Sequence, residues 1–170
     1  MMYGIAILPS AEIKEFANSY RKRFDPYYRV ISPHITVREK EDWTEEQLQT
    51  AVSHLEDLSR TVSPFQLTFN RFSSYFPVNN VIYLALEQVE PVIDLHDKLC
   101  TGPLLETEKA YSYHPHLTIG QKLGADELHD VLASVKNTPV DFSFNVESID
   151  LLGKQENGEW TVIRSFPLQG

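Results

Sequence analysis

Two short segments of the chain repeat one pattern of residues that can do acid–base chemistry. The first runs from Pro33 to Val37 and the second from Pro115 to Ile119, 82 positions further on. Each reads proline, histidine, an aliphatic residue, threonine and a second aliphatic residue. One such pattern would mean little. Two copies in a chain with ten prolines and six histidines are a rare coincidence by composition.

If both segments are strands, the alternation of side chains decides which residues share a face. His34 and Thr36 then point to one face, about 6–7 Å apart, while their aliphatic neighbours point to the other. His116 and Thr118 repeat this arrangement. If the two strands meet about a pseudo-two-fold axis, the cleft between them holds two imidazoles and two hydroxyls.

This set of side chains suits the hydrolysis or transesterification of a phosphodiester. A neutral imidazole can take a proton from the attacking oxygen, and an imidazolium can give one to the leaving oxygen. The attacking and leaving oxygens lie roughly in line across phosphorus, so the two histidines should flank it. The hydroxyls of Thr36 and Thr118 can donate to the phosphate oxygens. The arrangement needs no metal ion and no other cofactor.

The elements predicted around the motifs alternate between strands and helices. Strands are expected over 3–8, 29–37, 65–72, 81–87, 114–120, 140–152 and 160–168, and helices over 10–24, 44–58, 91–100 and 125–135. Thr44 to Gln47 has the pattern of a capping box, and Asn157-Gly158 is typical of a hairpin turn.

Adjacent hairpins imply antiparallel pairing, so the pattern predicts an α+β fold and not a doubly wound parallel sheet. We expect a single domain, residues 1–170, made of two pseudo-symmetric lobes. Each lobe would contribute one antiparallel sheet with outer helices, and the central cleft would carry the two His-x-Thr motifs. The lobe boundary is expected between residues 76 and 91, where a turn separates the two halves.

The charge of the chain limits its partners. The formal net charge is −9, whereas proteins that hold long duplex DNA usually present a basic face. A small phosphodiester, a cyclic nucleotide or an RNA end remains compatible with this charge. The densest basic cluster is predicted to be a solvated helix end; its residues are Arg21, Lys22, Arg23 and Arg29.

The single cysteine, Cys100, excludes an internal disulfide and is predicted to be a buried core residue. The apolar run at 3–8 is too short for a signal peptide, and no stretch approaches the roughly 20 apolar residues of a membrane span. The expected location is therefore the cytoplasm. His54, His96 and His129 lie in helical patterns, where surface or half-buried positions are expected, and they receive no role.

Several neighbours of the motifs are candidates for the rim of the cleft. Arg38 falls on the predicted face of His34 and could contact a phosphate. His114 is expected either at the rim beside His116 or in solvent. Four aromatic residues could stack on a base or pack in the core; they are Phe72, Tyr75, Phe76 and Tyr113.

The paired motifs resemble those of the two-histidine (2H) phosphoesterase superfamily, which includes bacterial 2′-5′ RNA ligase-like proteins and cyclic nucleotide phosphodiesterases. Length, motif spacing and the start of the chain resemble its YjcG-like phosphoesterases. The resemblance implies a bilobal, duplicated α+β fold and catalysis without a metal ion. It also implies that His34 is the proton donor and His116 the proton acceptor, while Thr36 and Thr118 bind the phosphate.

The sequence thus predicts a hydrolase of a cyclic phosphate or phosphodiester, either 2′,3′-cyclic or 2′-5′ linked, on a nucleotide or an RNA end. Two alternatives stay open. The same cleft could serve an RNA-binding or 2′-5′ RNA-ligating module with little hydrolytic activity. His34, His114 and His116 could also hold a zinc ion, although no carboxylate lies at a suggestive spacing. The pattern specifies no oligomeric state.

Overall fold

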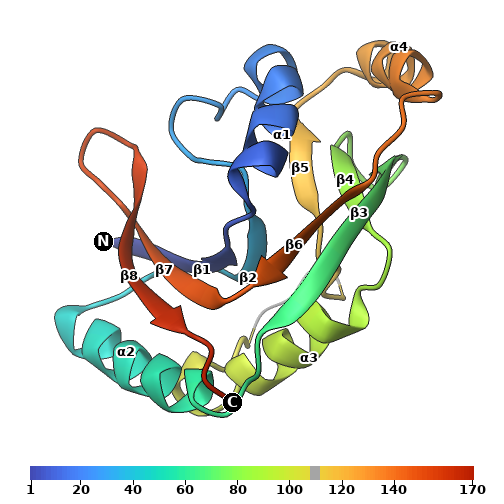
Figure 1. Cartoon of the computed structure of the whole chain (residues 1–170). Coiled ribbons are helices and arrows are strands. Elements are labelled where there is room, and N and C mark those ends of the chain that lie inside the picture. Colours follow the sequence, from blue (N-terminus) through green and yellow to red (C-terminus); the bar gives the residue numbers. More distant parts are fainter. Residues whose placement is uncertain (108–111) are drawn as a thin grey trace.

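One curved antiparallel sheet forms the centre of the fold (Figure 1). The computed structural model describes residues 1–107 and 112–170. The eight strands are β1 (Met2–Ile7), β2 (Ile35–Asp42), β3 (Phe65–Ser74), β4 (Ile82–Leu86), β5 (Leu117–Gly120), β6 (Phe142–Val146), β7 (Ser148–Lys154) and β8 (Trp160–Pro167). The helices are α1 (Ala11–Phe24), α2 (Glu45–Ser59), α3 (Glu90–Leu99) and α4 (Ala125–Val135), with a short 3₁₀ helix η1 (Gly102–Leu104).

The strand order reproduces the internal repeat of the sequence. The order is β6-β3-β4-β5-β2-β1-β7-β8, which divides into two sets of four at the contact between β5 and β2. These two central strands follow the two histidines directly. Each is reached through the same succession of strand, helix and strand, β1-α1-β2 in one set and β4-α3-β5 in the other. The α+β fold is therefore duplicated in its topology.

Two details of the predicted sheet are wrong. We expected two sheets, but β2 pairs with β5 through Ile35 and Leu117, so that both sets of strands form one sheet. The segment 140–152 was expected to be one strand. Instead, β6 ends before Glu147 and β7 begins after it, in the other half of the sheet. The apolar alternation changes phase at this break, from Phe142, Phe144 and Val146 to Ile149 and Leu151, and the prediction of one strand overlooked this signal.

One half of the sheet is inserted into the other along the chain, because β3 to β6 lie between β2 and β7. A cut between residues 76 and 91 would not separate them, because β3 precedes the cut and yet pairs with β4 and β6. The last two strands, β7 and β8, return to the half that contains β1. The half with β3, β4, β5 and β6 is therefore a continuous stretch of chain, and the other half combines strands from the two ends of the sequence.

The aliphatic residues of the motifs lie in the core, as the alternation predicts. Ile35, Val37, Leu117 and Ile119 are each 0% exposed. Burying side chains of this kind stabilises the fold by about 1.5–3 kcal/mol each. The covering helices are crossed, because α1 packs against β5 and α3 packs against β2. Each crossover helix thus supports the motif strand of the other half.

Two local signals of the sequence are confirmed. The Thr44 hydroxyl accepts from the Gln47 backbone N–H, while the Gln47 side chain accepts from the Thr44 N–H, which completes the capping box at the start of α2. The β7–β8 hairpin turns at Asn157 and Gly158, where Gly158 has a φ of +87°. Glycine adopts this left-handed conformation without the steric cost of a Cβ atom.

One basic residue expected in solvent is instead buried. Arg21 is 2% exposed and donates from Nε to Asp25 at 3.3 Å, from Nη1 to Asn18 at 2.7 Å and from Nη2 to the carbonyl of Ile31 at 2.7 Å. Asp25 also accepts from the side chain of Gln121 at 3.0 Å. This network ties the loop before the first motif to the residue that follows β5. The prediction of a fully solvated basic helix end is therefore wrong.

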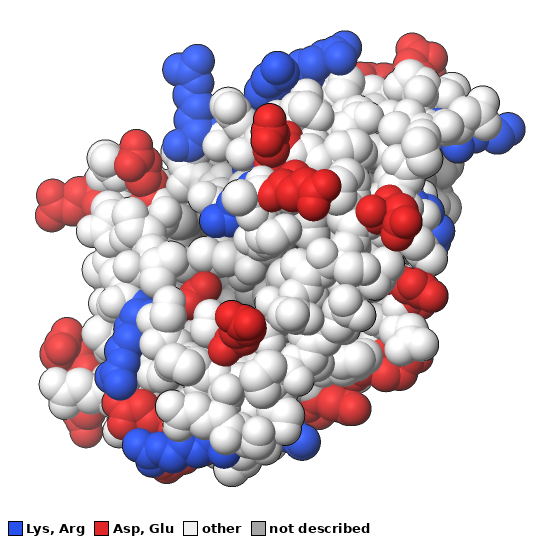
Figure 2. Space-filling view, viewed as in Figure 1, with Lys and Arg blue, Asp and Glu red and all other residues white. Residues whose placement is uncertain are grey.

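Charges of both signs are dispersed over the face of the molecule shown in Figure 2. On the face shown in Figure 2, the described Lys and Arg side chains lie apart and form no continuous basic stripe. Such a stripe is what binding along a duplex needs. Within residues 1–107 and 112–170, no helix is both long and apolar enough to traverse a bilayer.

The buried ion pair predicts a specific loss of stability. Asp25→Ala leaves the Arg21 guanidinium buried without its carboxylate, and we expect it to lower the free energy of unfolding by about 3–5 kcal/mol. Asp57→Ala is the matched control, because it removes an exposed carboxylate that pairs with Arg60 and should cost only about 0–1 kcal/mol. Urea unfolding followed by circular dichroism measures both. Equal losses in the two variants would contradict the structural role of Asp25.

Candidate active site

Both catalytic candidates lie one residue before a strand. His34 precedes β2 and His116 precedes β5, although the sequence pattern predicts strands that already begin at 29 and 114. The proline before each histidine has no N–H to contribute to a ladder, so regular pairing starts only after the histidine. The two imidazoles therefore stand at the starts of two adjacent strands.

The pairing of β2 with β5 determines how the four polar residues face one another. The residues that directly follow the two histidines are paired across these antiparallel strands. Continuing that register by one residue in each direction sets His34 opposite Thr118, and Thr36 opposite His116. Side chains at opposite positions have Cβ atoms about 4.5–5.5 Å apart. All four residues fall on the face opposite to the helices, because their neighbours in sequence lie in the core.

Each imidazole is fixed by the same local hydrogen bond. The Nδ1–H of His34 donates to the carbonyl of Ser32 at 2.8 Å, and the Nδ1–H of His116 donates to the carbonyl of His114 at 2.8 Å. Each acceptor belongs to the residue before the proline, which proline restricts to an extended conformation. A proton on Nδ1 leaves the lone pair of a neutral imidazole on Nε2. Nε2 is therefore the ring atom of each motif that is available to accept or donate a proton.

Burial favours the neutral form of both imidazoles. It lowers the pKa of His34 below the ordinary value of 6.5, and it lowers the pKa of His116 to about 4. Positive charge on His114 or His34 lowers the pKa of His116 further. A phosphodiester anion between the two rings would act in the opposite direction, because a nearby negative charge favours imidazolium.

Two tyrosines pack around the second motif. The Tyr75 hydroxyl oxygen lies 2.8 Å from Nδ1 of His116, so the single Nδ1–H is shared between this oxygen and the carbonyl of His114, and the Tyr75 hydrogen donates to the same carbonyl at 3.3 Å. The Tyr75 ring stacks on Tyr83, with centroids 4.5 Å apart, and both rings meet the His116 ring edge to face. The exposed His114 ring meets the same two tyrosines and therefore lies beside His116.

Arg38 does not have the position that the sequence suggests. A register shift between Thr36 and Arg38 breaks the alternation along β2, and the guanidinium is buried. Its Nε donates to the carbonyl of Leu104 at 2.9 Å, and its Nη2 donates to Glu41 at 2.8 Å. The charge is also placed over the Trp43 ring. Arg38 therefore holds the outer end of β2 and is not a phosphate ligand in our interpretation.

The other aromatic candidates have different surroundings. Phe72 packs against the aromatic residues of α1, so core packing is its role. Phe76 is exposed and touches the ring of His129. The Tyr113 hydroxyl donates to the backbone carbonyl of Thr36 at 2.7 Å. This hydrogen bond connects the segment just before the second motif to the first motif.

The histidines of the alternative zinc site do not form a ligand group. Among the described residues, the one group of three or more side chains whose ligand atoms lie within 4.8 Å of one another is His96, Cys100 and Glu106. Cys100 is buried, as predicted, but His96 is only 2% exposed, so its expected position near the surface is wrong. The i, i+4 spacing of His96 and Cys100 was the sequence signal for this cluster.

Comparison with known proteins identifies the family. The sequence profile of the 2′-5′ RNA ligase superfamily matches residues 9–158, so the chain belongs to this superfamily. A Bacillus licheniformis protein named "Putative phosphoesterase" is 41% identical over 168 residues, which cover 99% of both chains. A Halalkalibacterium halodurans protein of the same description is 38% identical over 168 residues, or 99% of this chain and 98% of its own. The resemblance carried by the two motifs is confirmed.

Solved structures share the fold at low sequence identity. Escherichia coli LigT complexed with 3′-AMP superimposes with a TM-score of 0.72 at 18% identity, over 99% of this chain and 98% of its own. The Thermus thermophilus protein TT0787 superimposes with a TM-score of 0.70 at 22% identity, over 100% of this chain and 99% of its own. These matches confirm the α+β fold over the whole chain.

The environment of the imidazoles predicts their titration. In the free protein, we expect the His116 ring to titrate near pH 4 and the His34 ring below pH 6.5, because burial disfavours imidazolium. Added inorganic phosphate should raise both pKa values. A ¹³C-edited NMR titration, assigned with His34→Gln and His116→Gln, measures them. In urea, both rings should return to about 6.5.

The lowered pKa of His116 also makes the stability of the folded chain depend on pH. The unfolded chain takes up the His116 proton at a pKa of about 6.5, whereas the folded chain takes it up at about 4. This contribution to stability is therefore complete above pH 6.5 and is lost as the pH falls toward 4. A folded-state pKa of 6.5 or higher for His116 would contradict the buried, neutral imidazole.

Proposed function

We propose that this protein is a phosphoesterase that hydrolyses a small cyclic phosphate or phosphodiester by two-histidine acid–base catalysis. The substrate class that we propose is a 2′,3′-cyclic or 2′-5′-linked nucleotide or RNA end. The observation that carries the proposal is the β2–β5 register, which brings one imidazole and one hydroxyl from each half to a single face. The reaction itself uses no metal ion in this proposal.

The proposed mechanism follows from the atoms available in the cleft. Nε2 of neutral His116 takes the proton of the attacking water or hydroxyl. Protonated His34 gives a proton to the leaving oxygen from Nε2, and the hydroxyls of Thr36 and Thr118 donate to the non-bridging oxygens. This assignment of acid and base follows the superfamily. The anionic substrate supports it, since its charge favours protonation of one imidazole in a cleft that otherwise keeps both neutral.

The relatives support the substrate class. Two proteins with identities of 38% and 41% to this chain are named as putative phosphoesterases. LigT was solved in complexes with 3′-AMP, with phosphate and with ATP, all of which carry phosphate groups. A short nucleotide also suits a chain with a net charge of −9 better than a long polyanion does.

Single substitutions of the two histidines test the proposal. The panel contains nucleoside 2′,3′-cyclic phosphates and 2′-5′-linked dinucleotides, with products separated by chromatography. We expect ring opening or cleavage by the native chain, and a loss of about 10²–10⁴-fold in kcat for His34→Ala and for His116→Ala, because each removes one proton transfer. His129→Ala, an exposed histidine on α4, is the control that should keep full activity. Prior treatment with a chelator should leave turnover unchanged when the assay is run well below the unfolding temperature, because no metal ion takes part in the proposed reaction.

Two results would overturn the hydrolase proposal. One is no turnover of the whole panel by the native chain. The other is turnover that neither His34→Ala nor His116→Ala reduces. Tight binding of RNA ends without turnover would instead favour the binding or ligating alternative.

Tyr75 provides a separate test of how His116 is positioned. Tyr75→Phe removes the hydroxyl that accepts from Nδ1 of His116, and we expect kcat to fall about tenfold, the equivalent of one hydrogen bond, with KM little changed. Tyr83→Phe is the matched control, because that ring packs on the same imidazole without a described hydrogen bond to it. The NMR signal of the His116 ring should shift in Tyr75→Phe alone. Equal kinetics in both variants would rule out a positioning role for the hydroxyl.

A further inference from the structure

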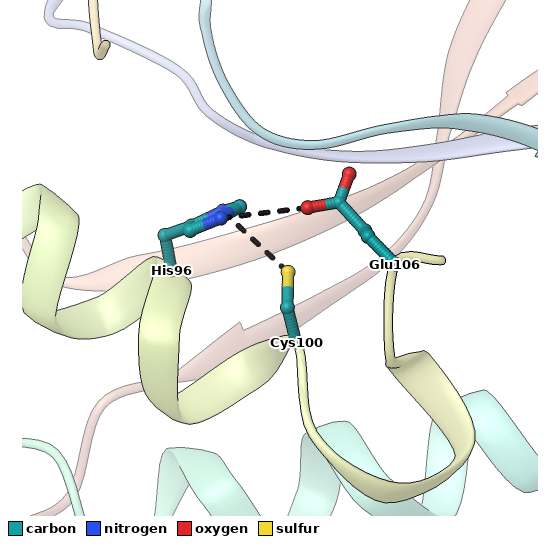
Figure 3. A group of neighbouring side chains, drawn as sticks. All are labelled: His96, Cys100 and Glu106. Atoms are coloured by element: carbon teal, nitrogen blue, oxygen red, sulfur yellow. Dashed lines mark hydrogen bonds and ion pairs between the residues drawn. The ribbon is translucent and has the colours of Figure 1, made fainter. Parts of the chain in front are cut away.

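A second group of reactive side chains lies on the helix side of the sheet (Figure 3). His96 belongs to α3, Cys100 caps the end of that helix, and Glu106 follows η1 by two residues. Their ligand atoms lie within 4.8 Å of one another. His96 is 2% exposed, Cys100 is 9% exposed, and the Glu106 side chain is 12% exposed. The proposed reaction uses none of these three residues.

The hydrogen bond of His96 determines which nitrogen faces the cluster. Its Nδ1 lies 2.6 Å from the carbonyl of Val37, so Nδ1–H donates there and the lone pair of the neutral ring is on Nε2. Metal-binding histidines are commonly oriented in this way, with the other ring nitrogen donating to a backbone carbonyl. The orientation therefore prepares Nε2 to act as a ligand.

The spacing of the ligand atoms fits an ion between them. Nε2 of His96 lies 3.4 Å from a carboxylate oxygen of Glu106, longer than the usual range of about 2.7–3.2 Å for a hydrogen bond. Two ligand atoms on a tetrahedral zinc ion, each about 2.0–2.1 Å from it, are about 3.4 Å apart. The Cys100 Sγ lies 3.5 Å from Nδ1 of the same ring, so the thiolate would have to turn toward Nε2 to bind the same ion; all three ligand atoms already lie within 4.8 Å of one another.

We propose that His96, Cys100 and Glu106 bind one zinc ion. A donor set of nitrogen, sulfur and carboxylate oxygen is of the mixed type that zinc accepts, whereas magnesium and calcium prefer oxygen alone. Binding replaces the thiol proton, which leaves to solvent, by a zinc–sulfur bond. One thiolate and one carboxylate then balance the double positive charge, so that the buried site is neutral. A water molecule would fill the fourth tetrahedral position.

The proposed role of this zinc site is structural. The aliphatic residues of β2, Val37 among them, face this side of the sheet, whereas Thr36 faces the cleft. The Tyr113 ring stacks on His96 with centroids 3.8 Å apart, and its hydroxyl holds the carbonyl of Thr36. A metal ion bound to His96 would therefore connect α3 and Glu106 to the first motif, through the Val37 carbonyl, and to the segment before the second motif, through Tyr113. Zinc would increase stability without taking part in the reaction.

Metal content and cobalt spectroscopy test the proposal on the full chain, free of any histidine tag. After growth with added zinc chloride, we expect about one zinc ion per chain by elemental analysis and about a tenth or less in Cys100→Ser and Glu106→Gln. Cobalt chloride added to the metal-free native chain should produce the near-ultraviolet absorption of a thiolate–cobalt bond. Since Cys100 is the sole cysteine, this band reports the proposed site directly.

A cleft variant separates this site from the catalytic one. The double variant His34→Ala/His116→Ala should keep its zinc and lose turnover, whereas Cys100→Ser should lose zinc and melt at a lower temperature. If the native chain takes up neither metal, the cluster is a buried ion pair beside a packed thiol, and the proposal is wrong. Zinc that disappears only in the cleft variant would also overturn it. If Cys100→Ser fails to fold, the cobalt titration of the native chain decides the question.

Discussion

The candidate site depends on a short contact between two strands, the pairing of β2 with β5. It aligns two motifs that are far apart in sequence and sets the imidazole of each beside the hydroxyl of the other. A slip of one residue would turn every polar side chain of one motif toward the core, because side chains alternate with a period of two. The four aliphatic residues of the motifs prevent this slip, since all are fully buried. Core packing thus determines the register of β2 and β5, and this register determines which imidazole and hydroxyl side chains lie next to one another.

So short a contact needs support from outside the two strands. The crossed helices provide it, since α1 covers β5 and α3 covers β2. Two polar connections reinforce them. Asp25, paired with Arg21, binds the residue after β5, and His96 donates to the carbonyl of Val37 in β2. These buried polar groups therefore lie where the two halves meet.

The sequence predicts the features that depend on local pattern. The duplicated motif, the buried aliphatic residues, the capping box and the Asn157-Gly158 turn each follow from a few adjacent residues. The join of the two predicted sheets, the crossing of the chain at Glu147 and the burial of Arg21 depend on contacts between distant segments. Arg38 shows the difference most clearly, because one register shift removes it from the face that strict alternation assigns. The prediction of four cleft residues does not depend on such a shift, since they lie within two residues of the β2–β5 pair.

The state of the two imidazoles links substrate binding to proton uptake. Burial lowers the pKa of both rings, so neither is charged at neutral pH in the empty cleft. The proposed phosphodiester would raise these pKa values, and by reciprocity a protonated ring would bind the anion more tightly. An acid–base mechanism needs one proton shared between two rings. In the proposed mechanism, this proton would arrive together with the substrate.

The two motifs are alike in sequence, so the difference between acid and base must come from their neighbours. The Tyr75 oxygen accepts from Nδ1–H of His116 and so withdraws that proton toward itself, which makes Nε2 a better base. Near His34, Asp25 favours imidazolium, but Arg21 pairs with it and opposes the charge more strongly. The charged neighbours of His34 therefore give no net help, and the Ser32 carbonyl, which favours imidazolium, does not offset the effect of burial on its pKa. A proton donor in that position depends on the substrate's own negative charge, and this dependence would confine acid catalysis to the occupied cleft.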